Sequence, residues 1–148
     1  AIGAIPLEIF MLLWGLCDNA RAALITRGIA ELARLGVAMG CNVHTFAGLA
    51  GIGDLIVTAT SMHSRNNRAG ILIGKGETPE QAVKEVGMVV EGMNALPAAL
   101  ELAAKYQVEM PIVQTVNAVV NKGMSAAEAV RSLMDRDPKN ELPQDYEK

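Results

Sequence analysis

Apolar residues recur every three or four positions along most of this chain, which is the period of an amphipathic α-helix. The longest pattern of this kind covers residues 19–40. Asp18 or Asn19 can cap that helix at its start, and Gly40 can end it. We therefore predict a long helix that buries one broad aliphatic face.

Four charged residues occupy the polar side of this helix: Arg21, Arg27, Glu31 and Arg34. Glu31 follows Arg27 by four positions, so the two side chains can meet on the helix surface. Such an exposed pair contributes only ~0.3 kcal/mol to helix stability. The pattern thus predicts that Glu31 faces solvent.

Five further helices are predicted in the second half of the chain, and several begin with recognisable capping residues. Ser64 can cap one helix, and Ser125 with Glu128 three positions later forms a capping-box pattern. Thr78 precedes Pro79, which is a strong signal for a helix start. The predicted spans are residues 65–76, 79–87, 93–107, 111–123 and 126–136.

Three other segments have weaker patterns. Thr45 can cap a short helix over residues 46–51. Residues 1–16, AIGAIPLEIFMLLWGL, carry a single charge and predict a core helix with Pro6 in its first turn. The β-branched segment DLIVTAT, residues 54–60, has no partner with hairpin spacing, so it gives poor support for a strand.

The whole pattern predicts one all-α domain over residues 1–136 and a polar, frayed tail over residues 137–148. Composition indicates an aliphatic core, because 51% of the residues are hydrophobic but only 3% are aromatic. The formal net charge of −3 argues against nucleic acid as a partner, since that needs a basic surface. The apolar start of the chain is shorter than the ~20 residues that cross a bilayer, so we expect no membrane span.

The two cysteines, Cys17 and Cys41, form neither a CxxC pair nor a Cys/His cluster with metal-ligand spacing. We expect reduced, largely buried thiols in a cytoplasmic protein, and no metal site. A single disulfide is the alternative.

The stretch GIGDLIVTATSMHSRNNR, residues 51–68, holds the candidate chemistry. Asp54 follows two glycines, so its carboxylate can lie in a confined place. Ser64, Arg65 and Asn66 fall at a predicted helix start, where free backbone N–H groups and the positive end of the helix dipole attract anions. The guanidinium adds a planar set of donors suited to phosphate oxygens. This arrangement predicts a site for a small phosphorylated, hydroxylated molecule.

The same residues also fit a purely structural role. Ser64 can be a cap and nothing more, Arg65 a solvated side chain, and Asp54 an acid in a turn. His44 and His63 lack companions that would complete a metal site, so we expect both to be surface or internally satisfied histidines. Spacing alone leaves the binding and the structural interpretations open.

Beyond single residues, the chain resembles the C-terminal helical domain of bacterial NAD(P)-dependent glycerol-3-phosphate dehydrogenases. Three blocks carry the resemblance, in the order and spacing of that family: NARAALITRGIAELARLG, TFAGLAGIGDLIVTATSMHSRNNRAG and VVEGMNALPAALELAAKYQVEMPI. The resemblance covers Gly15 to Arg136. It implies an all-α domain like the C-terminal part of 6-phosphogluconate dehydrogenase, placed after a Rossmann domain.

The same resemblance implies an oxidoreductase of glycerophospholipid and carbohydrate metabolism. Such an enzyme interconverts glycerol 3-phosphate and dihydroxyacetone phosphate by hydride transfer with NAD or NADP, in the cytoplasm and commonly as a homodimer. By their place in the motifs, the substrate-binding residues would be Asp54, Ser64, Arg65 and Asn66. The cofactor-binding residues would be Arg65, Val89 and Glu91.

The chain departs from the family upstream of Gly15. The family's proton-accepting lysine would fall on Ala1, and the first lysine of the chain is Lys75. The Rossmann domain is also absent from these 148 residues. Because alcohol oxidation needs a group that takes the hydroxyl proton, we assign no catalytic residue and expect no turnover from this chain alone.

Two other interpretations stay open. One is a helical association module with no ligand of its own, which would expose an apolar patch. The other is the same domain from a related dehydrogenase that acts on a different hydroxy acid or phosphate.

Overall fold

The computed structural model describes residues 18–61 and 63–136, and every regular element among them is helical. A 3₁₀ turn (η2, Val43–Thr45) and a π turn (η3, Leu49–Gly53) join the first two α-helices. The seven α-helices are α1 (Asp18–Ala38), α2 (Asp54–Thr60), α3 (Arg65–Gly74), α4 (Pro79–Val86), α5 (Glu91–Lys105), α6 (Pro111–Lys122) and α7 (Ala126–Met134). The all-α prediction is confirmed.

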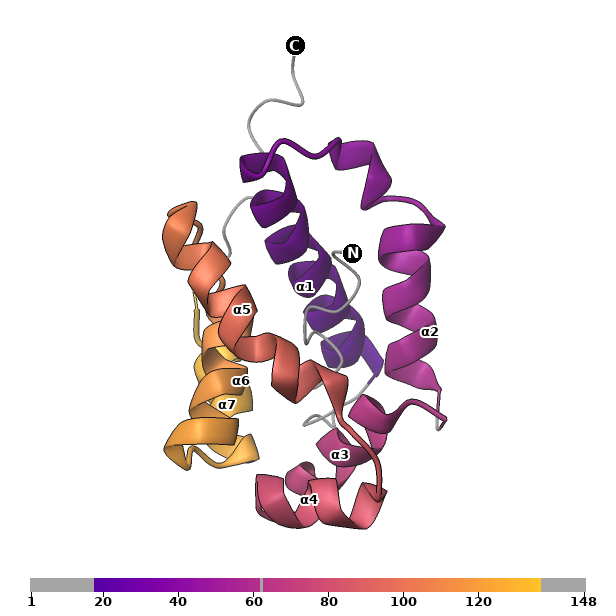
Figure 1. The fold of residues 1–148 in the computed structure, drawn as a ribbon, viewed down its shortest axis with the longest axis vertical. Helices are drawn as coiled ribbons and strands as arrows, with labels where there is room; N and C mark the ends of the chain where they lie inside the picture. Colours follow the sequence, from indigo (N-terminus) through magenta and orange to yellow (C-terminus); the bar gives the residue numbers. More distant parts are fainter. Residues whose placement is uncertain (1–17, 62, 137–148) are drawn as a thin grey trace.

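The long helix α1 lies between two groups of helices (Figure 1). α2 packs along one side of α1, while α6 contacts its other side and also packs against α5 and α7. α3 and α4 pack against each other at one end, and α3 also contacts α5. The largest buried cluster is aliphatic, as predicted, and contains Leu35, Ile73, Ala82, Leu96, Ala99, Ala103, Met110, Val113, Val116, Val119 and Ala129.

Several helix ends lie where their local sequence signals predicted them. Thr78 and Ser125 each complete a capping box at the starts of α4 and α7. Gly40 follows α1 with a φ of +87°, a conformation that glycine adopts without steric cost. There the N–H of Cys41 donates to the carbonyl of Gly36 at 2.8 Å, which ends the helix in a Schellman-type turn.

The predicted helix over residues 46–51 is wrong. Asn42 caps the 3₁₀ turn η2 instead, and Thr45 is the last residue of that turn. The chain then bends so that Phe46 is buried against α1. A Cβ at Gly36 would lie 2.6 Å from Cε2 of the Phe46 ring, so this glycine leaves the room that the ring occupies. The aromatic contact thus overrides the local helix signal.

Other predictions are met with small shifts, or lie outside the described residues. The segment DLIVTAT forms α2 and not a strand, and α5 begins two residues before the predicted start at residue 93. Cys41 is a free, half-buried thiol. Cys17, the helix predicted at residues 1–16 and the tail at 137–148 lie outside what the structure describes. No helix in the described ranges is long and apolar enough to cross a membrane.

The exposed ion pair predicted for Glu31 is also wrong. Only 2% of Glu31 is exposed, and its Oε1 accepts a hydrogen bond from the backbone N–H of Ile112 at 2.8 Å. Arg27 instead donates to the backbone carbonyl of Leu133. The N-cap residue of α6, Met110, makes no side-chain cap. Glu31 on α1 therefore supplies the acceptor that the first turn of α6 needs.

Burial changes the acid–base behaviour of Glu31. Loss of solvent raises the pKa of its carboxyl from 4.5 to about 7, against the opposing effects of the Ile112 hydrogen bond and the Arg34 charge. The second carboxyl oxygen, Oε2, is buried without a hydrogen-bond partner. Between pH 4.5 and about 7, the folded protein therefore keeps a proton on Glu31 that the unfolded chain has released.

We predict that this proton makes stability fall with rising pH. The folded pKa of about 7 lies above the unfolded value of 4.5, so the favourable contribution is complete below pH 4.5 and is lost as pH rises through 7. Between pH 5 and pH 8 the loss should be on the order of 2.5 kcal/mol. In Glu31→Gln, a neutral amide oxygen still accepts from Ile112, so this loss should disappear. Urea unfolding at both pH values tests this, and parallel pH profiles for the two proteins would contradict it.

Candidate functional site

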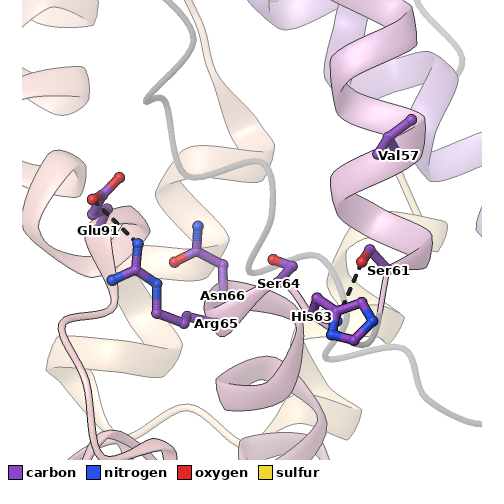
Figure 2. A pocket seen from close by; sticks show the side chains of 7 residues that line it. All are labelled: Val57, Ser61, His63, Ser64, Arg65, Asn66 and Glu91. Atoms are coloured by element: carbon purple, nitrogen blue, oxygen red, sulfur yellow. Dashed lines mark hydrogen bonds and ion pairs between the residues drawn. The ribbon is translucent and has the colours of Figure 1, made fainter.

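The three consecutive residues Ser64, Arg65 and Asn66 line one cavity of about 310 Å³ together with Glu91 (Figure 2). The cavity lies where the C-terminal end of α2, the first turn of α3 and the first residue of α5 meet. The remaining lining residues are Val57, Ser61 and His63.

Ser64 begins α3 and leaves backbone donors free at the cavity. Its backbone is extended, with φ −68° and ψ 123°, and its Oγ accepts from the N–H of Asn67 at 3.2 Å. The N–H groups of Arg65 and Asn66, at the start of the helix, have no acceptor within it. Because the Ser64 oxygen serves as acceptor, its hydroxyl proton remains to be donated. These donors and the helix dipole favour an anion here.

Arg65 brings the positive charge of the cavity, and Glu91 partly balances it. Nη2 of Arg65 lies 3.5 Å from Oε1 of Glu91, with side-chain exposures of 38% and 67%. An ion pair this exposed contributes roughly 0–1 kcal/mol. The guanidinium has five N–H donors, so most of them remain for a ligand. Figure 2 shows the Arg65 side chain reaching from α3 across to Glu91 on α5.

Asn66 is held in one orientation by a contact with α5. Its Oδ1 accepts from the backbone N–H of Gly92 at 3.0 Å, and the side chain is buried. With the oxygen fixed in that bond, the Nδ2 group remains as the donor. The hydrogen bond also supplies an acceptor to α5, whose N-cap residue Val90 makes no side-chain cap.

Two predicted site residues lie outside this cavity lining. Asp54 is the exposed first residue of α2. It shares a helix face with Val57 and Ser61 by spacing, but a rise of 1.5 Å per residue places it roughly 10 Å from Ser61. Val89 is exposed, two residues before Glu91. The structure thus brings Ser64, Arg65, Asn66 and Glu91 together and leaves the roles of Asp54 and Val89 as predictions.

The sequence patterns did not point to three of the lining residues. His63 was expected to be a surface or internally satisfied histidine; it is exposed, but it also lines the cavity. Its backbone N–H donates to Oγ of Ser61 at 3.2 Å, which shapes the turn between α2 and α3. The sequence does hold one signal for His63: it directly precedes the cap residue Ser64, so it must lie close to the start of α3. Val57 and Ser61, four residues apart, share one face of α2.

Comparison with known proteins identifies relatives of this chain. Residues 3–131 match the family model described as the C-terminus of NAD-dependent glycerol-3-phosphate dehydrogenase. The protein named glycerol-3-phosphate dehydrogenase [NAD(P)+] 2 of Lactobacillus delbrueckii subsp. bulgaricus is 66% identical over 128 residues. Its counterpart in Fusobacterium nucleatum is 60% identical over 125 residues.

A solved structure agrees with the sequence comparisons. The crystal structure of glycerol-3-phosphate dehydrogenase from Coxiella burnetii superposes with a TM-score of 0.81 at 38% identity, covering 91% of this chain and 41% of that one. The matches to the Lactobacillus and Fusobacterium relatives cover 86% and 84% of this chain. They cover only 38% and 37% of those relatives, so the chain spans about two fifths of their length.

The Arg65–Glu91 pair predicts that Glu91 weakens anion binding. A phosphate approaching Arg65 must compete with the Glu91 carboxylate and is repelled by it. Glu91→Gln should therefore bind inorganic phosphate about two- to five-fold more tightly than the wild type, in keeping with the modest strength of exposed pairs. Titration followed by ³¹P NMR measures the difference. Glu101→Gln is the matched control, because Glu101 is exposed on the same helix and does not line the cavity.

Proposed function

Because the chain belongs to the family of NAD-dependent glycerol-3-phosphate dehydrogenases, we propose that it is the substrate-binding domain of such an enzyme. The complete enzyme would interconvert glycerol 3-phosphate and dihydroxyacetone phosphate in the cytoplasm. In this proposal the present domain recognises the phosphoryl group, and the part of the relatives that this chain does not match supplies the remaining groups.

One observation carries the proposal: a fixed positive charge, a hydroxyl, an amide and a helix N-terminus all border one small cavity. Arg65 offers donors in the planar arrangement that suits phosphate oxygens. Ser64 and Asn66 add neutral donors whose acceptor atoms are already engaged. A cavity of about 310 Å³ suits a three-carbon phosphate ester far better than a macromolecule.

The reacting end of the substrate would need further groups. None of the side chains described as lining the cavity is a lysine. Oxidation of the substrate alcohol requires a group that takes the hydroxyl proton. We propose that a lysine from the rest of the enzyme does so, and that Asp54, exposed on the α2 face that continues from the cavity, holds that lysine. Phosphate binding without turnover is then the expected behaviour of this chain.

Two cavity-lining residues, Arg65 and Glu91, together with Val89 two positions before Glu91, fit one edge of a nicotinamide dinucleotide. Arg65 offers donors for a cofactor phosphate, the exposed Glu91 carboxylate can accept from a ribose hydroxyl, and exposed Val89 offers an apolar contact. When bound, NAD or NADP supplies the site that accepts or gives the hydride. In this proposal Arg65 and Glu91 orient substrate and cofactor beside each other.

We predict that Arg65→Ala weakens binding of glycerol 3-phosphate to the chain about ten-fold or more, since a hydrogen bond to a charged group contributes about 1.5–3 kcal/mol. Isothermal titration calorimetry measures the loss. Arg68→Ala is the matched control, because Arg68 is exposed on α3 and does not line the cavity. Equal affinities for the Arg65→Ala and Arg68→Ala proteins would contradict the assigned site.

Self-association is a second candidate function, and exposed apolar side chains near the cavity favour it. Val57, Met88 and Val89 are 64%, 59% and 57% exposed, so a partner that covered them would bury apolar surface. We predict that sedimentation velocity shows a dimer, and that added phosphate does not change the fraction of dimer. Replacing Met88 and Val89 by Ser should shift it towards monomer, and a wild-type monomer at every concentration would contradict this function.

A further inference from the structure

Asn67 is a fully buried amide next to the candidate site but outside its lining. Its exposed fraction is 0%, in the first turn of α3. Nδ2 donates to the backbone carbonyl of Ser61 at 2.8 Å and, more weakly, to that of Ala59 at 3.4 Å. Its own N–H donates to Oγ of Ser64. One residue of α3 is thus bonded to the end of α2 and to the turn that joins the two helices.

These contacts satisfy carbonyl groups that α2 leaves without partners. The last carbonyl groups of a helix receive no hydrogen bond from an N–H of the same helix, so their donors must come from elsewhere. α2 ends at Thr60, and the carbonyl of Ser61 receives both Nδ2 of Asn67 and the N–H of Ser64 at 3.1 Å. The turn that begins at Ser61 is therefore bonded to α3 through the carbonyl of its first residue. Two of its described members, Ser61 and His63, line the cavity directly before Ser64.

The neighbouring asparagine makes the corresponding contact on the opposite side. Asn66 bonds to Gly92 at the start of α5, while Asn67 bonds to Ser61 at the end of α2. The first turn of α3 is thereby tied to both walls of the cavity by two consecutive side chains. The distance between the end of α2 and the start of α5 therefore depends on both the Asn67–Ser61 and the Asn66–Gly92 hydrogen bonds.

We propose that Asn67 is a positioning residue for the phosphate site, an inference that rests on the proposed function. Without its amide, the end of α2 would move relative to the start of α3, and Ser61 and His63 would move away from Ser64 and Arg65. α2 is susceptible to such movement because it has only seven residues, too few to be stable as a separate helix. Exposed Ile56 and Val57 on α2 show that one side of this helix is not packed against the domain.

Asn67→Ala tests the inference, with Val116→Ala as the control for lost stability. Val116 is buried in the main core on α6 and does not line the cavity. We expect both variants to lower the melting temperature. Asn67→Ala should weaken binding of inorganic phosphate about ten-fold by calorimetry, while Val116→Ala should change it less than two-fold. Equal phosphate affinity in Asn67→Ala and the wild type would overturn the positioning role and leave the proposed function standing.

A measurement on the wild-type chain covers the case in which Asn67→Ala does not fold. If Asn67 holds the binding arrangement, phosphate must in return stabilise the bonds of Asn67, because coupling between two sites is reciprocal. Hydrogen exchange of the Asn67 side-chain amide, followed by NMR, should then slow at least three-fold on saturation with phosphate. Unchanged exchange in a chain that binds phosphate would overturn the inference. A wild-type chain that does not bind phosphate would overturn the inference and the proposed function together.

Discussion

The first backbone N–H groups of a helix need acceptors, and in α5 and α6 a side chain of another helix supplies one. Oε1 of Glu31 reaches from α1 to Ile112 in α6, and Oδ1 of Asn66 reaches from α3 to Gly92 in α5. Neither helix has a side-chain cap at its own N-cap residue. Each bond therefore caps the N-terminus of one helix and fixes its position relative to another helix. The candidate site depends on one of these bonds, because the Asn66 contact joins α3 to α5, and both helices line the cavity.

The free backbone groups at helix ends also explain why the cavity is polar. Its net charge is small because Arg65 is paired with Glu91. The N-terminal ends of α3 and α5 meet there, so backbone N–H donors gather in a small volume, while α2 contributes its C-terminal end. Glu91 offsets the charge of Arg65, and the acceptor atoms of Ser64 and Asn66 are occupied by backbone N–H groups. Apart from the exposed Glu91 carboxylate, most of the hydrogen-bonding capacity that remains at the site is donor capacity. A ligand rich in negatively charged acceptors suits it better than a neutral or cationic one.

Sequence patterns predicted what depends on neighbouring residues and failed where the partner is distant. The capping box at Ser125 and the helix starts at Thr78 and Ser64 depend on residues at most three positions apart, and they are predicted correctly. Glu31 was misplaced because its partner lies 81 positions away, and helical spacing favoured a surface pair. Ser64, Arg65 and Asn66 could be grouped because they are consecutive. Joining Glu91 to them required either the fold or the family resemblance.

The contact between Gly36 and Phe46 shows how a distant partner also constrains evolutionary variation. Glycine within a helix costs roughly 0.5–1 kcal/mol relative to alanine, so position 36 is locally unfavourable for α1. Any larger residue there would displace the aromatic ring that buries the following bend. A side chain gained at position 36 therefore requires a smaller one at position 46. Among homologues, this pair should covary although ten positions of chain separate its members.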